Sequence, residues 1–76
     1  MDLNEQVREA LEPLFQSGLV HDAHIQTGAP PGKVNVVVSL NAHNPELLRE
    51  DIMRRLEEHG LKVVSLNLFT NPLWRP

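Results

Sequence analysis

Histidine is the residue type that most plainly invites a chemical role in this 76-residue chain, which has four histidines and no cysteine. His43 directly precedes Asn44-Pro45-Glu46, a segment typical of a helix start. An imidazole at a helix N-terminus can ligate a metal ion together with a carboxylate or a second histidine, and Glu46 and His21 are the candidates for that role. The alternatives are a small anion held by the backbone N–H groups of the helix start, and a loop histidine hydrogen-bonded to backbone.

The other histidines have structural explanations. His21 and His24 are three residues apart, so on a strand their side chains point to opposite faces and do not form one site. We expect His21 at the boundary of the core and His24 in solvent. His59 precedes Gly60, and a helix C-terminus favours a histidine there through its dipole.

The remaining polar residues do not assemble a catalytic centre. Glu50-Asp51 and Glu57-Glu58 are neighbours in sequence, and adjacent helical residues diverge. General acid–base catalysis needs carboxylates that converge in a desolvated cleft. The lack of cysteine removes thiolate metal sites and a cysteine nucleophile. The sequence therefore predicts a protein that is not an enzyme and uses no cofactor.

Charge and hydropathy exclude several classes of partner. The net charge is −3, with seven basic residues interspersed among ten acidic ones. Nucleic-acid binding depends on clustered basic residues, and Arg54-Arg55 is followed at once by Glu57-Glu58. No apolar run approaches the roughly 20 residues that span a bilayer, and the N-terminus lacks the apolar region of a signal peptide. We expect a soluble cytoplasmic protein that binds neither nucleic acid nor membrane.

The N-terminal half predicts a helix and a β-hairpin. Asn4 is a suitable cap for a first helix, which should end near Leu11 or Glu12 because Pro13 follows. Alternating residues from 19 to 27 predict a strand, and valines at alternate positions from 33 to 40 predict a second one. In the first strand the inner side chains are expected to be Leu19, His21, Ala23 and Ile25. Two prolines in the five-residue segment 28–32 indicate the connecting loop.

The C-terminal half predicts a helix and one more strand. Asn44-Pro45 begins a helix with an apolar stripe, and Gly60 ends it as a left-handed residue. A third strand is expected over 61–69, and its inner residues are expected to be Val64, Leu66 and Leu68. A right-handed crossover through the helix makes the second and third strands parallel.

The predicted fold class is therefore α+β. It is a two-layer α-β-β-α-β sandwich whose three-stranded mixed sheet carries both helices on one face, in a single domain over residues 1–76. The other face of the sheet is expected to be partly exposed or to form a dimer surface. Its apolar residues are expected to be Val20, Val37, Val63 and Phe69.

Three passages carry a family resemblance. Residues 18–25, Gly-Leu-Val-His-Asp-Ala-His-Ile, resemble a Gly-Leu-Val-Tyr-Asp-Val-x-Ile first strand, and residues 34–40 resemble the strand that follows it. Residues 66–76 end in Pro-Leu-Trp-Arg-Pro, which is similar to an Asp-Pro-Pro-Trp-x-Pro tail. Over about residues 10–76 the chain thus resembles the iron–sulfur cluster assembly domain family, which includes PaaD-like proteins and cytosolic iron–sulfur targeting subunits.

The departures from that family concern its functional residues. The resemblance implies a reactive cysteine after the second strand, where this chain has His43 and Asn44. Glu12-Pro13 resembles part of the family's Asp-Pro-Glu motif, and Trp74 in the tail is expected either to close the core or to anchor a partner. The resemblance implies an accessory domain that binds proteins, with iron–sulfur assembly components among the candidate partners, and ligates no cluster. A metal-binding module built on His43 is the alternative. A homodimer is also expected, because so small a domain gains much by association.

Overall fold

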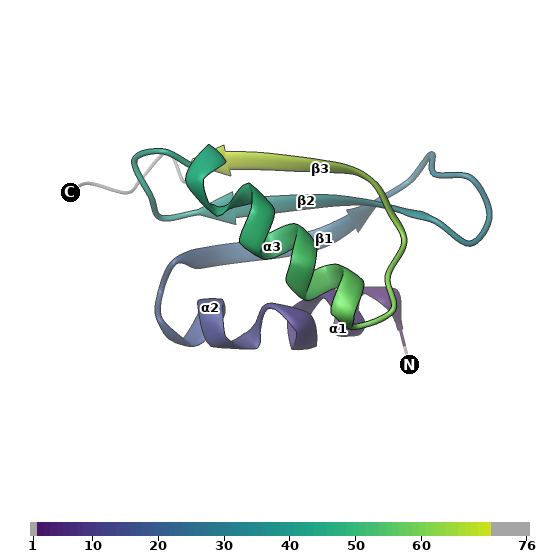
Figure 1. The fold of residues 1–76 in the computed structure, drawn as a ribbon, viewed down its shortest axis with the longest axis horizontal. Coiled ribbons are helices and arrows are strands. Elements are labelled where there is room, and N and C mark those ends of the chain that lie inside the picture. The colour runs from purple at the N-terminus through teal and green to yellow at the C-terminus, as the bar shows by residue number, and fades with distance from the viewer. Residues whose placement is uncertain (1, 71–76) are drawn as a thin grey trace.

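The computed structural model describes residues 2–70. These residues contain three helices and three strands (Figure 1). The sheet has the order β1-β2-β3, in which β1 (Val20–Gln26) is antiparallel to β2 (Val34–Leu40) and β2 is parallel to β3 (Val63–Thr70). The helices α1 (Leu3–Ala10) and α3 (Glu46–Glu58) lie on one face of this sheet (Figure 1). The predicted α+β sandwich with a mixed sheet is confirmed.

The first helical segment differs in detail from the prediction. Asp2 rather than Asn4 is the cap, since its carboxylate accepts a hydrogen bond from the N–H of Asn4 at 3.1 Å. The segment ends at Ala10, and a second short helix, α2 (Glu12–Gln16), follows. Pro13 lies in the first turn of α2, where a missing N–H costs nothing. The first helix thus ends beside the predicted end near Leu11 or Glu12, whereas the short helix α2 was not predicted.

The two faces of β1 are not those that strict alternation predicts. The pairing of β1 with β2 shifts between Val20 and Asp22, so one extra residue lies in β1 at this point. A bulge reverses the alternation, and Val20 and Ala23 are therefore both buried while His21 is exposed. The predictions that His21 borders the core and that Val20 faces outward are wrong for this reason.

The loop between β1 and β2 is a proline-punctuated turn, as predicted. The N–H of Lys33 donates to the carbonyl of Pro30 at 3.0 Å, and Gly32 has a φ of 79°. Proline followed by a left-handed glycine is the signature of a type II turn. The turn thus directs the chain back into β2.

Both ends of α3 agree with the prediction. The side chain of Asn44 accepts a hydrogen bond from the N–H of Glu46 at 3.2 Å, and Pro45 already has helical φ and ψ. At the other end Gly60 has a φ of 82°, and the N–H of Leu61 donates to the carbonyl of Leu56 at 3.2 Å. This is a Schellman arrangement, and it buries Leu61 against the core.

The beginning of β3 contains a second irregularity. Val34 pairs with Val63, but Asn35 pairs with Ser65, so Val64 is an extra residue. Val64 is consequently 51% exposed, while Val63 packs against the core. The predicted inward position of Val64 and outward position of Val63 are wrong, whereas Leu66 and Leu68 face the core as predicted.

The core lies between the sheet and the helices and is aliphatic. Its fully buried larger side chains come from α1, the junction after it, β2 and α3, namely Val7, Leu11, Val36, Val38, Leu40, Ile52 and Leu56. In the part of the chain that the structure describes, no helix is long and apolar enough to cross a bilayer.

Candidate functional site

The residues of the predicted site at the start of α3 lie in an exposed loop. His43 and Asn44 lie in the segment between β2 and α3, and both are exposed. Asn44 is occupied as a helix cap through its side-chain oxygen, which accepts the N–H of Glu46. The sequence therefore located the loop correctly, and the role that the structure gives Asn44 is to begin α3.

Glu46 is engaged with Arg49 of the same helix. Its two carboxylate oxygens accept from Arg49 Nε at 2.7 Å and from Arg49 Nη2 at 2.9 Å. The remaining terminal nitrogen, Nη1, donates to the backbone carbonyl of Leu66 in β3 at 2.6 Å. The hydrogen bonds from Arg49 lower the pKa of the Glu46 carboxyl below its ordinary value of 4.5. The carboxylate that was a candidate metal ligand thus holds a guanidinium against β3.

The other predicted site residues are not gathered into a metal centre. His21 is exposed at the bulge in β1, and Glu12 accepts a hydrogen bond from Gln16 within α2 at 3.1 Å. Within residues 2–70 no group of three or more histidine, aspartate or glutamate side chains lies close enough to hold a metal ion. Trp74 lies outside the described residues.

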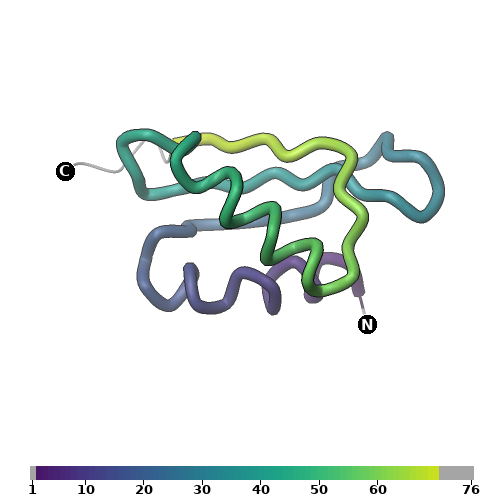
Figure 2. The backbone as a smooth tube through the Cα atoms, in the orientation of Figure 1, coloured from purple at the N-terminus to yellow at the C-terminus, as the bar shows by residue number. Residues whose placement is uncertain are grey.

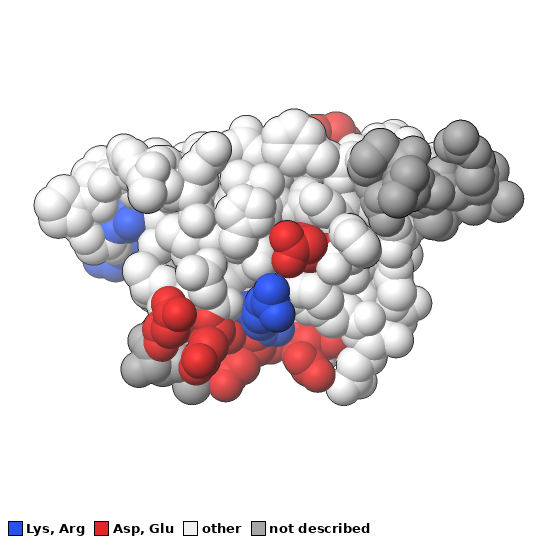
Figure 3. Space-filling model, turned by 180° about the vertical axis from the view of Figure 1, so that it is seen from behind, with Lys and Arg blue, Asp and Glu red and all other residues white. Residues whose placement is uncertain are grey.

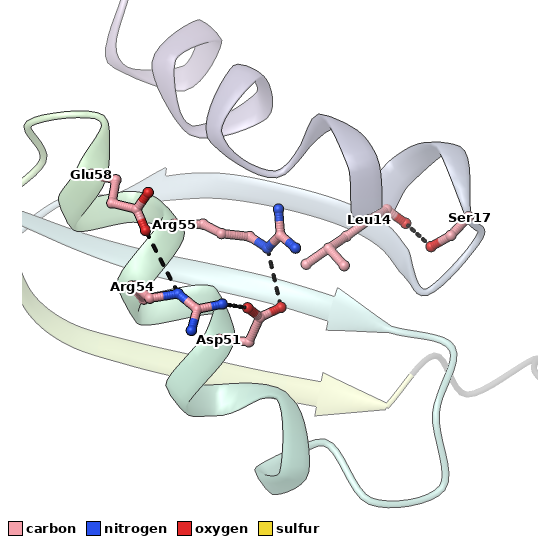
Figure 4. A network of polar contacts seen from close by, with 6 residues as sticks. All are labelled: Leu14, Ser17, Asp51, Arg54, Arg55 and Glu58. Atoms are coloured by element: carbon pink, nitrogen blue, oxygen red, sulfur yellow. Dashed lines mark hydrogen bonds and ion pairs between the residues drawn. The ribbon is translucent and has the colours of Figure 1, made fainter.

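Asp51 and Glu58, one member of each acidic pair of α3, form surface ion pairs, as Figure 4 shows. Asp51 accepts from Arg55 Nε at 3.1 Å and also pairs with Arg54, while Arg54 Nε lies 3.6 Å from Glu58. These are i,i+3 and i,i+4 contacts along one helix, which add modestly to helix stability. Their carboxylates face guanidinium groups rather than a common cleft.

A group of polar side chains on β1 was not found by sequence reasoning. Asp22 lies 3.5 Å from Arg8 of α1 and 3.6 Å from Nδ1 of His24. The three side chains are about half exposed, with values of 46% for Asp22, 62% for Arg8 and 52% for His24. The bulge brings Asp22 to this position, and no local sequence signal indicates a bulge. So open an arrangement leaves its groups in water, where ion pairs contribute little.

The face of the sheet away from the helices is largely uncharged. Figure 3 shows that acidic side chains gather along the edge where α1 lies, while most of the face has no charge. Val37 is only 9% exposed on this face although it lies outside the main core cluster, and Phe69 of β3 is 56% exposed. Phe69 is thus a large apolar side chain of β3 that is exposed to solvent on this face.

Searches against protein-family models, curated proteins and solved structures found no match to this chain.

Proposed function

We propose that this chain is a non-enzymatic accessory domain that binds other proteins in the cytoplasm and ligates no iron–sulfur cluster itself. The observation that carries the proposal is the outer edge of β3. The strand Val63–Thr70 contains no charged residue and no proline, and in the described part of the chain it pairs with β2 alone.

An edge of this kind is suited to strand addition. Proteins commonly protect edge strands with lysine, proline or a covering element, because unpaired peptide groups are templates for another strand. Here Val64 and Phe69 are 51% and 56% exposed along the same strand. Backbone hydrogen bonds supply affinity in β-strand addition, and exposed side chains of this type supply specificity. Within the iron–sulfur assembly context implied by the resemblance, assembly proteins are the first partners to test.

A metal-binding function is less well supported than protein binding. The three candidate ligands were Glu46, His43 and His21, and Glu46 is held by two hydrogen bonds from Arg49. Displacing that guanidinium would also remove the donor from the Leu66 carbonyl. The chemistry of Glu46 is therefore that of an ion pair at the sheet edge.

Metal content separates the two functions. The purified chain is incubated anaerobically with iron and sulfide, and separately with zinc, and is then desalted. We expect retained metal and sulfide far below one equivalent per chain. Stoichiometric iron or zinc that is lost in His43→Ala would contradict the proposal.

Protein binding is tested by a photo-crosslinking residue placed at Phe69 and, as a matched control, at Leu3 of α1, which is 44% exposed. In an extract of the source cells, position 69 should give discrete protein adducts and position 3 should not. Equal labelling from the two positions, or none from position 69, would refute a binding surface at β3.

A further inference from the structure

The direction of the peptide groups in β3 follows from a hydrogen bond at the opposite edge of the sheet, on β1. The side chain of Asn4 accepts the N–H of Ile25 at 2.9 Å, so this N–H points away from β2. The residue opposite Ile25 in the antiparallel pair is Val36. Opposite residues in such a pair either exchange both hydrogen bonds or neither, so the N–H and C=O of Val36 point away from β1 and toward β3. The N–H of Val34, two residues earlier, indeed donates to the carbonyl of Lys62 at 2.9 Å.

The pairing of β2 with β3 fixes the direction of the β3 peptide groups. Val36 is opposite Leu66, and in a parallel pair it bonds to the residues on either side of its partner, which are Ser65 and Asn67. The peptide groups of Leu66 and Leu68 therefore point outward, away from β2. The contact of Arg49 with the Leu66 carbonyl agrees with this assignment, because the guanidinium reaches that oxygen from α3 at 2.6 Å.

The outward N–H groups at the two edges of the sheet have different surroundings. On β1 a side chain of α1 satisfies the outward N–H of Ile25. β3 lies at the upper border of the described chain in Figure 2 and pairs with β2 alone. Among residues 2–70, no strand therefore pairs with the outward N–H groups of Leu66 and Leu68. A strand that docks at this edge can therefore form backbone hydrogen bonds without displacing any element among residues 2–70.

A second copy of this chain can pair with the edge in an antiparallel register that places outward-pointing residues opposite each other. Placing Leu66 opposite Leu68 of the other copy forms reciprocal hydrogen bonds on both sides of a two-fold axis at Asn67. The Leu66 carbonyl can accept from its new partner and from Arg49, since it has two lone pairs. In this register the two apolar side chains meet on the helix-covered face, and two Asn67 amides meet on the open face.

The charges beside the edge are self-complementary in the same register. Because β2 and β3 are parallel, α3 runs antiparallel to β3, so Glu46 lies farther toward Thr70 than Arg49 does. Three helical residues advance about 4.5 Å, which is close to the rise of one and a half strand residues. Arg49 contacts the Leu66 carbonyl, and Glu46 therefore lies farther along β3, between the levels of Asn67 and Leu68. Across the axis, each Arg49 faces the Glu46 of the other copy.

We propose that this domain forms a homodimer by antiparallel pairing of its two β3 strands, giving a continuous six-stranded sheet with a Glu46–Arg49 network at the two-fold axis. This inference rests on the proposed protein-binding function and names the partner as a second copy of the chain.

Charge reversal tests the axis. Glu46→Arg leaves two cations beside the edge and Arg49→Glu leaves two anions, so each variant should lose self-association at least about tenfold, since juxtaposed like charges are costly at an interface. An equimolar mixture of the two variants should associate again, because every cation then faces an anion. Sedimentation equilibrium from micromolar to millimolar concentration measures this. Glu9→Arg on α1 is the control and should associate like the unaltered chain.

Amide exchange in the unaltered chain provides a test that needs no variant. The N–H groups of Leu66 and Leu68 should become protected as protein concentration rises, while that of Asn67 is protected throughout because it bonds to β2. A chain that remains monomeric at millimolar concentration would overturn the dimer. So would association that both charge variants retain, or a mixture that fails to restore it while both variants remain folded by circular dichroism. A monomer that still forms protein adducts from position 69 would refute the dimer alone and leave the proposed function standing.

Discussion

Asn4 should matter to stability because its side chain accepts an outward-pointing N–H at the β1 edge of the sheet. Its Oδ1 accepts the N–H of Ile25 at 2.9 Å, which joins α1 to β1. Asn4→Ala removes the acceptor and leaves that N–H to water. Asn4→Asp retains an oxygen at the same place and adds a negative charge in the first turn of α1, where the helix dipole favours it.

The expected magnitude follows from three contributions. Loss of a typical hydrogen bond costs about 0.5–1.5 kcal/mol. Alanine returns up to roughly 0.5 kcal/mol through its higher helix propensity. Asn4→Ala should therefore lower the free energy of unfolding by about 0.5 kcal/mol. Asn4→Asp should raise it by roughly 0.3–1 kcal/mol through the helix dipole. The two variants should differ by about 1 kcal/mol, which corresponds to about 4–8 °C in Tm for a domain of this size.

Thermal melts and amide exchange at Ile25 check this prediction. The Ile25 N–H should exchange faster in Asn4→Ala than in the unaltered chain and remain protected in Asn4→Asp. Unchanged protection of Ile25 in the alanine variant would refute the bond. The inference that the peptide groups of Leu66 and Leu68 point outward would then also lose its support, because it begins from this hydrogen bond.

Three further predictions concern the core, the hairpin and pH. Ile52→Ala should lose about 2–5 kcal/mol in urea unfolding because Ile52 is fully buried, whereas Leu47→Ala, at a side chain 79% exposed, should stay within about 0.5 kcal/mol. Gly32→Ala should lose roughly 1–2 kcal/mol because the turn holds a φ of 79°, and normal stability of the purified variant would argue against the type II turn. Because the Arg49 hydrogen bonds lower the pKa of Glu46, the stabilisation from this pair is complete above pH 4.5 and is lost as pH falls through the lowered pKa. The stability difference between the unaltered chain and Glu46→Gln should shrink over that range, and a difference that grows on acidification would contradict the sign.

Local chemistry made much of the fold predictable. Asn44-Pro45 and Gly60 bound α3 because capping oxygens, proline φ and left-handed glycine act within a few residues. Two prolines and Gly32 set the hairpin turn for the same reason. The alternating valines of β2 are buried as predicted, since β2 is the central strand and is paired on both sides without interruption of its own alternation.

The errors arise where one strand meets another. The bulges at Val20/Asp22 and at Val34/Asn35 exchange the faces of His21 and Val64, and a bulge is decided by cross-strand pairing that no single strand encodes. In the same way the side chain of Asn4 suits a helix cap locally, but the approach of β1 gives it the N–H of Ile25 to accept.

The sequence by itself determined the α+β class, the two ends of α3, the turn and the uncharged third strand, because these depend on residue type and short-range spacing. Tertiary structure decided that Glu46 holds Arg49 against the Leu66 carbonyl, and that the candidate ligands do not form a group of three within residues 2–70. It also decided that β3 pairs on one side only among those residues. These features depend on contacts between residues distant in the chain, and such contacts exist only once the helices have packed on the sheet.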